Sequence, residues 1–114
     1  MTTELGGTLA RISAMVTASY PEGMVDELVM RRRLGKVNVE VGELGDAIEG
    51  WTGENPRKGV YATRDDVIKE LIDCASAALC AVEYMTGDRG QSVDMLAVQV
   101  QGNWDRLQRA VADG

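Results

Sequence analysis

Histidine and phenylalanine are absent from this 114-residue chain, and proline and cysteine occur only twice each. Without histidine the chain has no His-ligated zinc site, no Ser-His-Asp triad and no di-iron bundle of the Glu-x-x-His type. Aromatic residues make up only 4% of the sequence, whereas Ala, Val, Leu and Met are frequent. Because this composition favours packed helices over a sheet-based core, we predict an all-α fold.

Long apolar runs are also missing, since no stretch approaches the roughly 18 to 20 residues that a membrane span requires. The first residues lack the basic segment and apolar run of a secretory signal. Cys74 and Cys80 lie six residues apart in one predicted helix, too far round to pair easily, and are predicted to be small buried side chains in a reducing compartment. We expect a cytoplasmic protein without membrane contact.

Positive charge is in deficit, with a net charge of −6 and a pI near 4.6. Binding to nucleic acid requires a basic surface that neutralises phosphates, so we predict no nucleic-acid partner. The chain also lacks the GxxxxGK[ST] loop of P-loop proteins. Its length predicts one domain over residues 1–114, with a core small enough that dimerisation would help to stabilise it.

Apolar periodicity and turn residues predict about four helices, over residues 8–19, 22–50, 64–85 and 92–112. Thr63 and Asp66 have the spacing of a capping box at the start of the third helix. Apolar side chains at three- and four-residue steps predict one core stripe on the second helix and another on the third. These stripes comprise Leu34, Val37, Val41, Leu44 and Ile48, and Val67, Leu71, Cys74, Ala75, Ala78, Val82 and Met85.

Two pairs of acidic residues stand beside these stripes. Glu40 and Glu43 lie one turn apart on the second predicted helix, and Glu70 and Asp73 have the same spacing on the third. The turn-rich connection between the helices allows them to run antiparallel, so that all four carboxylates converge. Clustered carboxylates repel one another unless cations lie among them, and an all-oxygen ligand set suits Mg²⁺ or Mn²⁺.

A single pair of this kind is commonplace on solvated helices, and an acidic face that only confers solubility is the alternative interpretation. If metals bind, they would bridge phosphate oxygens and lower the pKa of a bound water. The residues therefore favour metal-assisted hydrolysis with carboxylates as ligands and base.

Other features allow two interpretations each. The run Arg31-Arg32-Arg33 is either a solvated basic patch or a steering surface for a polyanionic substrate. Arg57 and Lys58 are either an ordinary exposed turn or contacts for phosphate oxygens. The small residues Ala77 and Cys80 beside the acids allow close helix packing or a flat ligand such as a nucleobase. Trp104 is either a core or dimer contact or a base-stacking side chain.

The segments Lys36-Val-Asn-Val-Glu40-Val-Gly-Glu43-Leu and Gly53-Glu-Asn-Pro-Arg-Lys-Gly59, followed by Glu70-Leu-Ile-Asp73, resemble the ExxE…ExxD signature of the MazG-like all-α nucleoside triphosphate pyrophosphohydrolases, in particular a small actinobacterial and phage subgroup. The resemblance covers about residues 34–82. Many relatives carry a polar residue, often Asn, after the second acidic pair, where this chain has Ala77 and Cys80.

The resemblance implies a helical bundle completed by dimerisation and a homodimer or homotetramer. It implies Mg²⁺ held by Glu40, Glu43, Glu70 and Asp73, and cleavage of a nucleoside triphosphate into the monophosphate and pyrophosphate. Glu43 is the candidate for the catalytic base. Candidates for substrate contacts are Lys36, Arg57 and Lys58 at the phosphates, and Trp51 and Asn55 at the base.

Three functions remain open from the sequence. The first is a Mg²⁺-dependent pyrophosphohydrolase that acts on non-standard or excess nucleotides. The second keeps the fold as a catalytically weak or inactive regulatory module that binds a cation and a nucleotide. The third is a structural helical dimer whose carboxylates form a solvated face.

Overall fold

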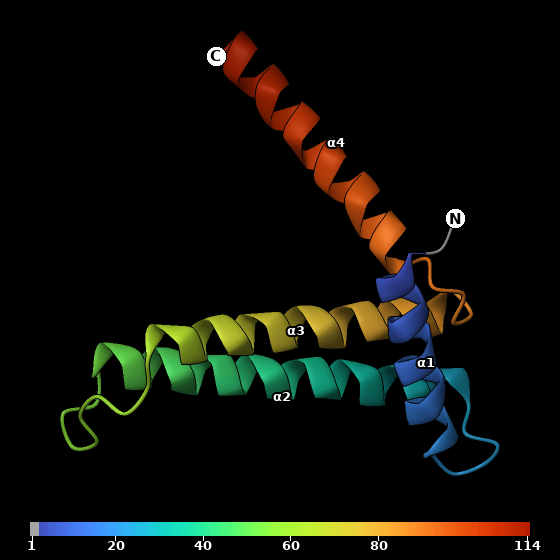
Figure 1. Ribbon diagram of the computed structural model, residues 1–114, viewed down its shortest axis with the longest axis horizontal. Coiled ribbons are helices and arrows are strands. Elements are labelled where there is room, and N and C mark those ends of the chain that lie inside the picture. The colour runs from blue at the N-terminus through green and yellow to red at the C-terminus, as the bar shows by residue number, and fades with distance from the viewer. Residues whose placement is uncertain (1–2) are drawn as a thin grey trace.

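The computed structural model describes residues 3–114 of the chain, and within this range it contains four helices and no strand. They are α1 (Glu4–Ala18), α2 (Asp26–Thr52), α3 (Arg64–Met85) and α4 (Ser92–Asp113). The predicted all-α class and the number of helices are confirmed. Figure 1 shows α2 and α3 side by side and antiparallel, with α1 across one end of the pair and α4 leading away from it.

Local signals determine where the helices begin and end. The side chain of Thr3 accepts a hydrogen bond from Gly6 N, so α1 begins earlier than predicted. The prediction that the second helix starts near residue 22 is wrong, because a turn delays α2 to Asp26. Gly53 ends α2 in the left-handed conformation, with φ of 68°, which glycine adopts without a steric penalty.

The capping box at the start of α3 is confirmed. Thr63 Oγ1 accepts from Asp66 N at 3.1 Å, and Asp66 Oδ2 accepts from Thr63 N at 2.8 Å. These bonds satisfy two backbone groups that would otherwise lack partners in the first turn. At the other end of α3, Gly87 has φ of 88° and follows the C-cap Thr86, so a glycine in the left-handed conformation comes directly after the helix.

The hydrophobic core of the single chain is small. The buried apolar residues are Leu9, Ala10, Val29, Ala47 and Val67. The prediction that the apolar stripes of the second and third helices are core is confirmed for Val67 and is wrong for Leu34, Val41 and Leu71, which are each at least half exposed. Among the described residues, α1 crosses the α2–α3 pair at one end and α4 leads away from it (Figure 1), and the exposed stripe residues stay open to solvent.

Three charged side chains are buried as well, namely Arg33, Glu40 and Glu83. Arg33 is only 4% exposed, so neither interpretation of the basic run applies to it. Its guanidinium donates to Ser13 O at 2.7 Å, to Thr17 Oγ1 at 2.6 Å and to Cys80 O at 3.4 Å. These bonds connect α2 to both α1 and α3.

Glu83 is completely buried near the end of α3. Its two carboxylate oxygens accept hydrogen bonds from Gly90 N at 2.7 Å and from Ser92 N at 2.8 Å. Burial alone would raise the pKa of Glu83, but the hydrogen bonds from Ser92 and Gly90 together leave it below its usual value. Glu83 thereby joins the end of α3 to the first turn of α4.

Cys74 and Cys80 are free thiols and are partly buried. Burial is the main cause that raises the pKa of both thiols, so neither has the lowered pKa of a reactive cysteine. Within the described part of the chain, no helix combines the length and the apolar character that crossing a bilayer demands.

Candidate metal centre

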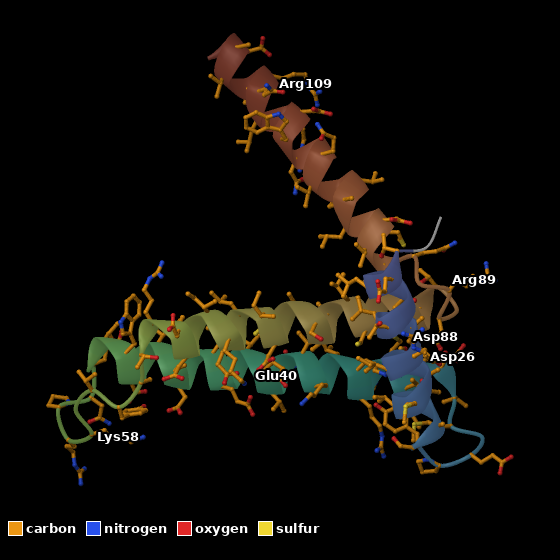
Figure 2. All side chains as sticks on the ribbon, viewed as in Figure 1. Asp26, Glu40, Lys58, Asp88, Arg89 and Arg109 are labelled. Carbon is orange, nitrogen blue, oxygen red and sulfur yellow. The ribbon has the colours of Figure 1, made fainter. Side chains whose placement is uncertain are left out.

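Three of the four predicted carboxylates converge between α2 and α3. One oxygen each of Glu40, Glu43 and Glu70 lies within 4.8 Å of the other two. Glu40 is buried, Glu70 is half-buried and Glu43 is exposed, so the cluster extends from the helix interface to the surface. Figure 2 shows Glu40 near the middle of the α2–α3 pair, where the two helices lie side by side.

Helical geometry explains this convergence. The i, i+3 spacing puts Glu40 and Glu43 on one face of α2, and the antiparallel course of α3 brings Glu70 opposite them. Among the described residues, Glu70 Oε2 is a buried oxygen without a hydrogen-bond partner. Its other oxygen is 3.9 Å from Lys69 Nζ. A buried carboxylate oxygen without a donor is unfavourable, and a cation between the helices would satisfy it.

Asp73 is the predicted ligand that lies outside this cluster. Its Oδ2 accepts a hydrogen bond from Lys69 Nζ at 3.0 Å, one turn earlier on α3. Asp73 still lines the same hollow as Glu40, so it remains close to the cluster. The structure therefore brings together three of the four predicted ligands and pairs the fourth with a lysine.

Electrostatic repulsion within the cluster acts on the pKa of Glu43. The negative charge of Glu40 is the main cause that raises the pKa of Glu43 above its usual value, followed by burial, a hydrogen bond with Glu40 and the charge of Glu70. A divalent cation among these groups would reverse this effect.

Lys36 supplies the positive charge nearest to the cluster. Its Nζ lies 2.8 Å from Glu40 Oε1, one turn away on α2. The hydrogen bond and charge of Glu40 raise the pKa of Lys36. Lys36 is thus beside the acids, as a phosphate contact would need to be, and is paired with one of the predicted ligands.

Two hollows lie on either side of the acidic cluster. One, of about 300 Å³, is bordered by α1, α2 and α3 and lined by Glu40, Asp73 and Lys36 with apolar residues of α1. Its remaining lining residues are Ile12, Val16, Tyr20, Arg33, Ser76, Ala77 and Cys80. Ala77 and Cys80 therefore border an open space next to the acids, and the choice between close helix packing and a flat ligand stays a prediction.

The second hollow, of about 510 Å³, opens toward the α2–α3 loop and is lined by Glu43, Glu70 and Tyr61. Tyr61 donates to Asp46 Oδ1 at 3.0 Å, and Lys58 Nζ lies 5.8 Å from the centre of its ring. The sequence interpretation missed Tyr61, for which the loop pattern gave no signal.

The other predicted substrate contacts lie at the loop end of the α2–α3 pair. Figure 2 shows Lys58 there, away from Glu40. Arg57 is exposed, and its backbone N donates to Asn55 Oδ1 at 3.0 Å within the loop. Trp51 is 44% exposed in the last turn of α2. None of Trp51, Asn55 and Arg57 lines either hollow, and their roles stay predictions.

Arg33 was also missed as a residue bordering the site. The signal was present, because Val29, Arg33, Glu40 and Ala47 follow one another at steps of four and seven residues and share one helix face. All four are buried. The arginine run concealed this pattern, since two of its members, Arg31 and Arg32, are exposed.

The donor set fits a hard divalent cation. All three converging side chains are carboxylates, the ligand type that Mg²⁺ and Mn²⁺ prefer, and one buried oxygen lacks a partner. Burial and then the negative charges of all four acids raise the pKa of the Cys74 thiol. This raised pKa makes the thiol a poor metal ligand. Comparison of the chain with protein-family models, curated proteins and solved structures found no match.

Proposed function

We propose that this protein is a divalent-cation-dependent nucleoside triphosphate pyrophosphohydrolase with a MazG-like helical fold. The observation that carries the proposal is the convergence of Glu40, Glu43 and Glu70 from two antiparallel helices. The carboxylate oxygen of Glu70 without a partner supports it, because a merely solvated acidic face would leave its oxygens in water.

Glu40, Glu43 and Glu70 would hold Mg²⁺, with Mn²⁺ as the alternative ion and Asp73 as the fourth ligand. Bound there, the ion supplies neutralisation of the phosphate oxygens and a lowered pKa of a coordinated water. The substrate is a nucleoside triphosphate, and the products are the nucleoside monophosphate and pyrophosphate. Water is added across the anhydride bond between the α and β phosphates.

The residues of this chain have separate tasks in that reaction. Glu43 is the most exposed of the three acids and would accept the proton of the attacking water. When Glu40 coordinates the cation, its ion pair with Lys36 opens. Lys36 then pairs with a phosphate oxygen through a charge-assisted hydrogen bond.

The test is pyrophosphate release from a panel of ribo- and deoxyribonucleoside triphosphates in the presence of Mg²⁺. We expect Glu43→Gln to abolish release while the circular dichroism spectrum and melting temperature show a folded protein. Glu22→Gln, in the exposed turn before α2, is the matched control and should retain full activity. Absence of turnover with every triphosphate rejects the enzymatic function.

The regulatory module is separated from the enzyme by a binding measurement. A nucleotide with Mg²⁺ that raises the melting temperature without forming product identifies a binding protein of the same fold. If neither Mg²⁺ nor any nucleotide changes the melting temperature, the carboxylates are a solvated face.

A further inference from the structure

Arg33 is a buried cation without an anionic partner. It is 4% exposed, and among residues 3–114 no carboxylate forms an ion pair with it. Its guanidinium donates four hydrogen bonds, all to uncharged oxygens of Ser13, Thr17 and Cys80. A charged group in such surroundings is unfavourable unless each of its donors has an acceptor.

One donor of this guanidinium has no acceptor. The four hydrogen bonds of Arg33 are all made by its two terminal nitrogens, Nη1 and Nη2. The third nitrogen, Nε, is buried and has no hydrogen-bond partner in the described part of the chain. A ligand oxygen that meets this N–H therefore gains a charge-assisted hydrogen bond without displacing another acceptor.

Arg33 also borders the hollow of about 300 Å³ between α1, α2 and α3. Four apolar or small side chains of α1 and α3 line this hollow, namely Ile12, Val16, Ala77 and Cys80. A cavity of about 150 Å³ holds one benzene ring, so this hollow has room for a flat ligand of one or two rings. Apolar walls with a few polar groups that fix the orientation are typical of small-molecule sites.

The hollow meets the candidate metal centre at Glu40. This residue lines the hollow and is also one of the three converging carboxylates. Lys36 and Asp73 border the hollow as well. A nucleotide whose phosphates lie at the carboxylates can therefore place its base in the hollow, on the side of Arg33.

We propose that this hollow binds the base of the nucleotide and that Arg33 selects a base with a carbonyl oxygen. The inference rests on the proposed function for the identity of the ligand. It gives Arg33 the task that the sequence assigned to Trp51 and Asn55, neither of which lines the hollow.

The chemistry of the donor determines the selection. Because Nε is buried, a group that projects from the edge of a base reaches it more readily than a nitrogen within the ring. The projecting carbonyl oxygens of uracil, guanine and hypoxanthine accept a hydrogen bond. In adenine the projecting group is an amino donor, which an N–H cannot bind. Adenine nucleotides are therefore the disfavoured ligands.

The test is calorimetry of the full chain in Mg²⁺ with inosine monophosphate and adenosine monophosphate. Position C6 of the base carries an oxygen in the first and an amino group in the second. We expect the first to bind more tightly by about tenfold or more. Equal affinities, or no binding of either nucleotide, overturn the proposal.

Arg33→Lys keeps the positive charge and removes the N–H of Nε. In this variant, shown to be folded by its circular dichroism spectrum, we expect the two affinities to become equal. If Arg33 only supports the fold, its replacement weakens both affinities alike and their ratio stays that of the wild type. That outcome overturns the selection by Arg33.

Ala77→Leu tests the location of the base without removing any hydrogen bond of Arg33. The larger side chain occupies part of the hollow and should weaken binding of inosine monophosphate by about tenfold or more. The Mn²⁺ affinity of the carboxylates should not change. Ala14→Leu makes the same substitution at an exposed position of α1 and should bind like wild type. Unchanged binding by Ala77→Leu overturns the location.

This inference and the proposed function can fail separately. If no triphosphate is hydrolysed while inosine monophosphate still binds selectively, the enzymatic function is wrong and the base site is supported. If inosine and adenosine triphosphates are hydrolysed with equal kcat/KM, the enzymatic function is supported and the selection by Arg33 is overturned.

Discussion

Lys36 Nζ and Glu40 Oε1 lie 2.8 Å apart, one helical turn from each other at the edge of the acidic cluster. The lysine is 64% exposed in its side chain and the glutamate only 9%, so the pair connects the buried end of the cluster to solvent. An ammonium in this position competes with a divalent cation for Glu40 and is close enough to meet a phosphate that binds there.

Replacement of this lysine separates those two effects. In Lys36→Gln we expect the Mg²⁺ affinity of the protein without nucleotide to be unchanged or higher, because a competing cation is removed. We expect KM for the nucleotide to rise about tenfold or more, which corresponds to loss of a charge-assisted hydrogen bond. Calorimetry and steady-state kinetics measure the two quantities. Arg11→Gln on α1 is the control, and an unchanged KM for Lys36→Gln contradicts the phosphate contact.

The two predicted metal ligands on α3, Glu70 and Asp73, should differ in their contribution to cation affinity. Glu70 lies in the cluster with an oxygen that lacks a partner, whereas Asp73 is paired with Lys69. Glu70→Gln should therefore lower Mn²⁺ affinity by about a hundredfold or more, since it removes an anionic ligand that has one buried oxygen, and Asp73→Asn should lower it less. Titration of each variant followed by electron paramagnetic resonance of Mn²⁺ gives the affinities. Equal losses would show that Asp73 is as close a ligand as Glu70.

Repulsion between Glu40 and Glu43 predicts a pH dependence of stability in the presence of a chelator. Because the pKa of Glu43 is raised in the folded chain, the folded state holds this proton more tightly than the unfolded state. Stability should thus fall as pH rises from the ordinary glutamate pKa through the raised value. Glu43→Gln should melt higher than wild type at pH 7, and the two should converge below the ordinary pKa.

Addition of Mg²⁺ should remove the difference by which Glu43→Gln melts higher than wild type at pH 7. Wild type gains stability from the bound cation, by about 2.7 kcal/mol at a concentration one hundred times Kd, and Glu43→Gln gains less. Thermal melting with and without the chelator gives both numbers. Identical pH profiles of the two proteins would show that the carboxylates do not interact in solution.

Gly6 is required by a close approach between α1 and the turn before α4. A Cβ atom added at Gly6 would lie 2.3 Å from the backbone oxygen of Gly90, which cannot give way as a flexible side chain could. Gly6→Ala should therefore destabilise the chain by about 1 to 3 kcal/mol. Gly7→Ala, where the nearest atom is Arg11 Nη1 at 3.7 Å, should stabilise it by about 0.5 to 1 kcal/mol. Urea unfolding of both variants checks the opposite signs.

The buried carboxylate of Glu83 should contribute to the stability of the fold. Its two charge-assisted hydrogen bonds to backbone N–H groups are lost in Glu83→Ala, which should cost about 2 to 4 kcal/mol in urea unfolding. Because the pKa of Glu83 is lowered in the folded state, its contribution is present above the ordinary pKa and is lost as pH falls through the lowered value. Glu54→Gln in the exposed α2–α3 loop should have no effect on either measurement.

Much of the local structure could be predicted from the sequence. The start of α3 at Arg64 followed from the Thr63–Asp66 capping box, and its end at Met85 from Gly87, because each is an interaction among residues within one or two turns. The i, i+3 spacing likewise places Glu40 and Glu43 on one face whatever the rest of the chain does. The start of α2 was wrong by about four residues because the turn after Pro21 extends to Val25.

The candidate site was predictable only in part. Spacing indicated that two pairs of acids could meet. It did not indicate that Glu70 joins the cluster while Asp73 pairs with Lys69, because this depends on side-chain contacts between and along the helices. Nor does spacing determine whether a charged residue such as Arg33 is solvated. Its burial follows from acceptors on α1 and α3, which are distant in sequence.

The sequence by itself determined four amphipathic helices, an acidic chain without histidine and two carboxylate pairs, because these depend on residue type and on the 3.6-residue period. Only the tertiary structure decided which three acids share a site, which apolar stripes remain exposed and that α4 points away from the other helices. The physical reason is that burial is a property of the neighbours that surround a side chain, and those neighbours are brought together by the packing of helices distant along the chain.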